Sequence, residues 1–326
     1  MTKISADFIN DLQLPAIMAP MFLVSNPKMV IEGCKNGIIG SFPALNARTG
    51  SIFSQWMSEI KTELEKEKEN ETAPEIAPWA VNFIANKKAN KRYDEDLTLI
   101  REFQPPIVIT SLGDPAPVID IVHEYGGLVF TDVIDVFYAR KAAEKGTDGL
   151  ILVCNGAGGH AGTYHPMAFI KEVKKFFHGI TILAGSISEG EDLVAAEAMG
   201  ADLSYIGTKF IAASESSAPS EYKQMLIDST MDDIVYTDVF SGVNANYLVP
   251  SIENKGIKMS ELQQSSQGKN LHHLSDAKAW KDIWSAGHGV GSINKIEGVQ
   301  EIVTDLKNGY ERTLKKLTKK VKAGEE

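Results

Sequence analysis

Cysteine is scarce in this chain, and its spacing gives no sign of a disulfide framework or a zinc site. Cys34 and Cys154 are the only two cysteines in 326 residues, and they form no CxxC pair. Small disulfide-stabilised domains and zinc-binding modules need more cysteines at closer spacings, so both classes are disfavoured. The sequence also contains no HExxH metalloprotease motif and no Walker A loop. We expect no metal.

An excess of positive charge is missing as well. Lys and Arg number 33 against 43 Asp and Glu, which gives a net charge of −10 and a pI of about 5.3. Nucleic acids and anionic membranes bind basic surfaces, so neither is an expected partner. No apolar run approaches the roughly 18 residues of a membrane span, and residues 1–10 lack a secretion-signal pattern. These absences favour a cytoplasmic protein.

What is present is a regular alternation of short apolar segments with helical patterns. Apolar runs that predict strands cover residues 14–20, 37–42, 79–84, 106–110, 127–131, 149–154, 180–184 and 202–206. Patterns that predict helices follow seven of them, at residues 27–35, 51–69, 94–103, 115–125, 134–145, 166–177 and 189–199. Continuous apolar strands that alternate with amphipathic helices indicate a parallel sheet covered on both faces.

Eight such units within about 200 residues predict an α/β fold of the (β/α)₈ TIM-barrel type. The alternative is an open doubly wound sheet, which normally carries GxGxxG directly after its first strand. In this chain that position reads Ala19-Pro20-Met21-Phe22, with no glycine. The barrel is therefore favoured.

The regular alternation of strand and helix patterns stops after Phe210. We expect residues 1–212 to form the barrel and 213–290 to form a smaller, mainly helical subdomain inserted after strand 8. That subdomain would lie over one barrel mouth. An amphipathic helix over residues 299–321, within a C-terminal part of 291–326, would complete the helical ring. Within the insertion we expect helices at 220–229 and 259–283, and a loop or short strand at 239–249.

Glycines gather where barrels carry their functional sites, at the carboxyl ends of the strands. Residues 154–162 read CNGAGGHAG, so that His160 stands among glycines after the sixth strand. Gly185-Ser186 and Gly207-Thr208 follow the seventh and eighth strands, where barrels frequently bind phosphate. Each loop alone is also compatible with a plain glycine turn. Together they predict a phosphate-bearing cofactor across the barrel mouth.

The chain resembles the FMN-dependent nitronate monooxygenases over essentially its whole length. The resemblance is carried by PAIMAPM at 15–21, VNF at 81–83, AGGH at 157–160, AGSI at 184–187, IGTKF at 206–210 and SAGHGVG at 285–291. It implies FMN as cofactor, and an alkyl nitronate and O₂ as substrates. A homodimer is left open.

The resemblance also implies roles for single residues. FMN would be contacted by Ala19, Pro20, Met21, Asn82, Gly158, Gly185, Ser186, Gly207 and Thr208. His160 would be the catalytic histidine. His288, in the late glycine-rich loop, either lines the substrate site or supports its own loop.

Departures from the family pattern keep the reaction open. Gly156 stands where the family usually has Glu, and Val153 where a Gln is common. His288 replaces a frequent Gln, and Lys209 a frequent Arg. One alternative is an NAD(P)H-dependent FMN reductase of the same scaffold, which acts on enoyl-acyl-carrier-protein or quinones. The other is a non-catalytic barrel that binds a phosphorylated metabolite.

Overall fold

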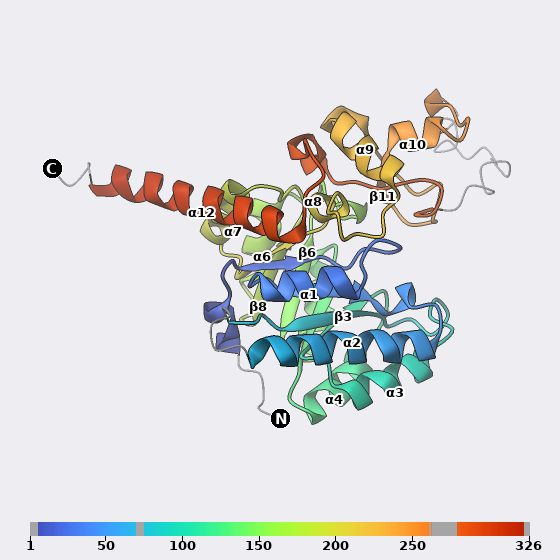
Figure 1. The fold of residues 1–326 in the computed structure, drawn as a ribbon, viewed down its shortest axis with the longest axis vertical. Helices are drawn as coiled ribbons and strands as arrows, with labels where there is room; N and C mark the ends of the chain where they lie inside the picture. Colours follow the sequence, from blue (N-terminus) through green and yellow to red (C-terminus); the bar gives the residue numbers. More distant parts are fainter. Residues whose placement is uncertain (1–5, 70–74, 261, 263–278, 323–326) are drawn as a thin grey trace.

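A computed structural model describes residues 6–69, 75–260, 262 and 279–322 of the chain (Figure 1). Eight parallel strands form one sheet in the order β1-β9-β8-β6-β5-β4-β3-β2. They are β1 Ala16–Met18, β2 Gly40–Pro43, β3 Trp79–Ile84, β4 Ile107–Ser111, β5 Leu128–Val133, β6 Gly149–Val153, β8 Ile180–Ala184 and β9 Leu203–Ile206.

The sheet closes on itself between β1 and β2. Ile17 and Ile39 form a parallel bridge, and the Met18 amide donates to the Ile39 carbonyl at 2.8 Å. Both ends of the strand order are therefore joined, and the predicted (β/α)₈ barrel is confirmed. Its interior is filled by buried side chains, among them Ile17, Ile39, Ala80, Ile107, Ile109, Phe130, Ile151 and Ile182.

Helices cover the outside of this barrel. They are α1 Pro27–Lys35, α2 Gly50–Lys68, α3 Tyr93–Phe103, α4 Ala116–Glu124, α5 Val136–Glu144, α6 Pro166–Val173 and α7 Gly190–Met199. The start of helix α1 follows from its sequence. The Asn26 side chain caps the helix by accepting from the Met29 amide, and Pro27 occupies the first helical position. Short 3₁₀ turns lie at Ala6–Asp11, Ala44–Asn46, Met231–Asp233 and His288–Ser292.

Helix α12, Val299–Lys322, lies against both α7 and α1, which is the place of the eighth helix in the ring. Ile302, Val303 and Leu306 are buried there. The apolar stripe continues farther along the helix, but Leu314 and Leu317 are 38% and 46% exposed. Figure 1 shows the reason, because the end of α12 projects beyond the helices it packs on.

Between β9 and α12 the chain forms a smaller layer over the carboxyl ends of the strands. It contains α8 Thr208–Ile211, α9 Ser220–Asp228, α10 Val249–Glu253 and an antiparallel hairpin of β10 Ile234–Thr237 and β11 Ala245–Leu248. Strand β11 lies within the segment 239–249, for which a loop or short strand was expected, whereas β10 was not predicted. Strand β11 also pairs with β7, Gly159–His160.

One predicted helix is only partly testable. The expectation for 259–283 falls largely on residues 261 and 263–278, which lie outside the described residues. At its end the helix prediction is wrong. Trp280 has φ +69, and its amide donates to the Ile283 carbonyl at 2.9 Å, so this segment is a tight turn. Over the described ranges, the longest helices are too polar to cross a bilayer.

Candidate active site

One large cavity opens at the carboxyl ends of the barrel strands. Its volume is about 1260 Å³, which exceeds the roughly 300–1,000 Å³ of a pocket for one small ligand. All nine residues predicted to contact FMN line it, and so does His160. The space is large enough for a cofactor and a second molecule beside it.

The glycine turns after β8 and β9 form one side of this cavity. Gly185 has φ +120, and a Cβ there would lie 2.9 Å from the Asn155 carbonyl oxygen, so the turn itself needs glycine. Gly207 differs, because a Cβ on it would meet its nearest atoms, in Ala19 and Met21, at 3.7–3.9 Å. Glycine is therefore not required here by packing, and the lack of a side chain leaves this part of the cavity open.

Hydrogen bonds from backbone amides tie the loop 154–162 and Thr208 to the late glycine-rich loop. The His288 amide donates to the Gly156 carbonyl, and the Gly159 amide donates to Ser285 Oγ, both at 2.9 Å. The Gly287 amide donates to Thr208 Oγ1, also at 2.9 Å. The insertion therefore closes over the barrel mouth as an integral part of the site.

This contact explains the glycine at position 156. Gly156 has φ +82, and a Cβ there would lie 2.3 Å from Ser186 Oγ and 3.1 Å from His288 Nδ1. A glutamate would not fit this loop conformation. The His288 ring packs behind Gly156, and His288 is not among the residues that line the cavity, although Gly287 and Gly289 beside it are.

His160 is held by the insertion as well as by the barrel. Its backbone pairs with Ala245 of β11, and its ring meets Trp280 edge to face with centroids 5.3 Å apart. Nε2 lies 3.3 Å from Ser241 Oγ. Ser241 donates its own proton to the Val243 carbonyl, so Nε2 carries the hydrogen and donates to Ser241. That assignment leaves the Nδ1 lone pair free to accept a proton.

Burial lowers the pKa of His160 below its ordinary value of 6.5. The physical cause is that a partly enclosed imidazolium loses hydration without gaining an anionic partner. The ring is therefore neutral at pH 7. A neutral imidazole in a cavity is suited to act as a base.

The nitronate monooxygenase family model matches residues 12–309. The chain belongs to that family. The nitronate monooxygenase of Neurospora crassa is 25% identical, and the match covers 97% of this chain and 94% of that protein. The nitronate monooxygenase of Paraburkholderia phytofirmans is also 25% identical, over 66% of this chain and 65% of that protein.

Solved structures show the same fold. FabK from Thermotoga maritima superimposes with a TM-score of 0.77 at 22% identity, over 98% of this chain and 99% of that one. Nitroalkane oxidase from Streptomyces ansochromogenes gives 0.76 at 21% identity, over 96% and 100%. Because the chain belongs to this family, it is an oxidoreductase, and the family is flavin-dependent.

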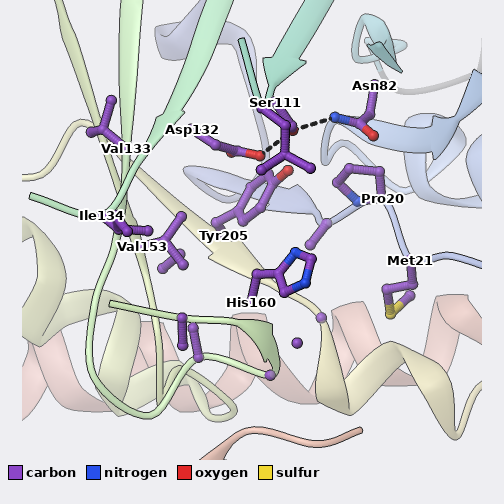
Figure 2. A pocket seen from close by; sticks show the side chains of 18 of the residues that line it. Pro20, Met21, Asn82, Ser111, Asp132, Val133, Ile134, Val153, His160 and Tyr205 are labelled. Carbon is purple, nitrogen blue, oxygen red and sulfur yellow. Dashed lines mark hydrogen bonds between the residues drawn. The ribbon is translucent and has the colours of Figure 1, made fainter. Parts of the chain in front are cut away.

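Sequence reasoning missed three polar residues of the cavity wall beside Asn82. Asn82 lies in β3, two residues before its end, and donates through Nδ2 to Ser111 Oγ of β4 at 2.7 Å. Ser111 donates in turn to Asp132 Oδ2 of β5. Tyr205 of β9 lines the same cavity, and Figure 2 shows its ring close to Ser111 and Asp132. A signal was available, because Asp132 interrupts an apolar run near a strand end just as Asn82 does.

Burial raises the pKa of Asp132 to about 6, and the hydrogen bond from Ser111 opposes that rise. Its other carboxyl oxygen, Oδ1, is enclosed without a hydrogen-bond partner. Burial also raises the pKa of Tyr205, and the negative charge of Asp132 adds to that effect. This side of the cavity therefore carries polar groups whose protonation depends on their enclosure.

Proposed function

We propose that this chain is an FMN-dependent nitronate monooxygenase, which oxidises alkyl nitronates with O₂. The observation that carries the proposal is one large cavity, with two glycine turns on one side and His160 on another. Such a cavity matches a phosphate-bearing cofactor that lies across the mouth and leaves space for a small substrate.

The residues present fit FMN. The backbone at Gly185-Ser186 and Gly207-Thr208, with two hydroxyl groups, would hold the phosphate. The turn after β9 has no side chain at Gly207 to fill that space. Met21, Val133 and Val153 give apolar wall for the ring system, while Asn82 gives a polar contact (Figure 2). Bound FMN supplies the two-electron acceptor that the side chains of a protein lack.

His160 would act on the proton of the substrate. A neutral nitroalkane must lose a proton next to its nitro group before it becomes a nitronate, and the Nδ1 lone pair of His160 is suited to take it. The hydrogen bond from Nε2 to Ser241 holds the ring in that tautomer. A substrate that is supplied already as the nitronate would need this base much less.

Oxygen consumption by the purified protein tests the proposal. We expect a yellow protein that releases FMN on denaturation and consumes O₂ when a primary alkyl nitronate is added. The alternative reductase would instead oxidise NADH or NADPH in the presence of an enoyl thioester or a quinone. A protein that purifies without flavin and cannot be reconstituted with FMN would support the phosphometabolite-binding barrel and contradict the proposal.

A further inference from the structure

The hydrogen bonds that join Asn82, Ser111 and Asp132 run in one direction only. Asn82 Nδ2 lies 3.2 Å from the carbonyl oxygen of Ile109. A carbonyl only accepts, so the amide nitrogen of Asn82 must face it. The same nitrogen donates to Ser111 Oγ, and Ser111 therefore gives its own proton to Asp132 Oδ2.

This direction decides which atom Asn82 offers to the cavity. Both of its N–H groups are used within the barrel wall, by Ile109 and Ser111. Among the residues the structure describes, no donor reaches the Asn82 side-chain oxygen. In Figure 2 the nitrogen points to Ser111, whereas the oxygen lies on the side of Pro20. Asn82 thus presents a hydrogen-bond acceptor.

The sheet order places this acceptor opposite the glycine turns. In the closed order of eight strands, β3 lies across the barrel from β8, and β4 lies across from β9. A molecule whose phosphate is held after β8 and β9 reaches the ends of β3 and β4 with its far part. The oxidised flavin ring carries a single ring N–H donor, N3–H, in its pyrimidine part.

We propose that Ser111 and Asp132 are positioning residues for flavin recognition, which hold Asn82 so that its side-chain oxygen accepts from flavin N3–H. The proposal rests on FMN being the cofactor, as inferred above. It assigns a role to two residues that the motifs of the sequence did not single out. Asp132 is the last acceptor in this series of hydrogen bonds, and it keeps the Ser111 proton turned away from Asn82.

Ionisable side chains from several elements line the cavity that Asp132 faces. They are Tyr205 of β9, His160 of β7, Asp114 after β4, Lys141 and Glu144 of α5, and Lys145 directly after α5. Strand β6 contributes no ionisable side chain. Since burial raises the pKa of Asp132 to about 6, its carboxylate accepts fully from Ser111 above that pH. FMN affinity should therefore be higher above pH 6 and decline below it.

Flavin binding to the full-length chain, stripped of its cofactor, tests the proposal without any turnover. Quenching of flavin fluorescence gives Kd for FMN and for 3-methyl-FMN, which lacks only the N3–H donor. At pH 8 the wild-type chain should bind the methylated analogue at least about tenfold more weakly, because a built acceptor is left unpaired. Ser111→Ala and Asp132→Leu should weaken FMN binding and shrink the ratio of the two Kd values to about threefold or less.

Two further variants separate positioning from general damage. Asp132→Asn still offers an oxygen that accepts from Ser111 but does not titrate, so it should keep the ratio and lose the pH dependence. Thr147→Val removes another buried, hydrogen-bonded hydroxyl of the barrel, one that does not line the cavity. It should change neither the ratio of the two Kd values nor the pH dependence of FMN binding.

The outcomes that overturn the proposal are distinct from those that overturn FMN binding. If the wild-type chain binds FMN and 3-methyl-FMN equally well, or if a folded Ser111→Ala keeps the full ratio, the positioning role is wrong and FMN binding stands. If the wild-type chain binds neither flavin, the proposed function fails and this role fails with it. The wild-type comparison needs no variant to fold.

Discussion

Replacement of His160 by asparagine separates catalysis from structure. The pairing of His160 with Ala245 runs through the main chain, so it survives the substitution. The changes are the loss of the hydrogen bond to Ser241 and of the edge-to-face contact with Trp280. The asparagine keeps a polar group in the cavity but cannot take a proton near neutral pH.

The two effects differ greatly in size. One hydrogen bond of a partly exposed side chain and one aromatic contact are together worth about 1–2 kcal/mol of stability. A general base contributes about 10²–10⁴ in rate, which corresponds to about 3–5 kcal/mol of activation free energy. His160→Asn should therefore remain folded and yellow at 25 °C while it loses most of its turnover.

Steady-state oxygen consumption with two forms of one substrate provides the assay. The loss should be largest with the neutral nitroalkane, whose proton must be removed, and smaller with the preformed nitronate. Ser241→Ala keeps the imidazole and serves as the matched control, with a loss of about tenfold or less. If His160→Asn keeps turnover within a few-fold of wild type on every substrate that reduces the flavin, His160 is structural.

Three further outcomes are expected. Because burial lowers the pKa of His160, kcat/KM for a neutral nitroalkane should stay level as pH falls to 6.5 and decline only below it, and a decline that begins above pH 7 would contradict this. Gly207→Leu should fold but lose FMN, since its side chain enters the cavity; a folded variant with full flavin content would refute the phosphate placement. Gly190→Ala places a Cβ 2.1 Å from the Tyr310 amide nitrogen, so it should cost about 1–3 kcal/mol and lower Tm by several degrees. Gly291→Ala, where a Cβ meets nothing within 4 Å, should leave Tm unchanged.

Much of the barrel was predictable because its signals are local. The run 79–84 is apolar and bounded by polar segments, and it forms β3 over the same residues. Asn26-Pro27 marks a helix start by capping chemistry, and α1 begins there. Strand β5 extends two residues beyond its predicted end because its ladder with β6 continues to Val133, through the polar Asp132.

The unpredicted parts depend on partners far away in the chain. Strand β7 has two residues, and it exists because β11, about eighty-five residues later, pairs with it. The turn at Trp280 needs φ +69, which is uncommon for a bulky side chain. Asn82 and Asp132 each interrupt an apolar run, but the hydrogen bonds that link them through Ser111 could not be predicted, because only the barrel register brings β3, β4 and β5 side by side at these residues.

Reduction of the bound flavin in the absence of oxygen tests the central claim most directly. The purified protein is mixed anaerobically with a primary alkyl nitronate, and separately with NADH or NADPH, while the flavin absorbance near 450 nm is followed. A nitronate monooxygenase should lose this absorbance rapidly with the nitronate and only slowly, or not at all, with the nicotinamides. Rapid bleaching by NADH or NADPH, with the nitronate inert, would contradict the proposed activity and identify the chain as a reductase on the same barrel.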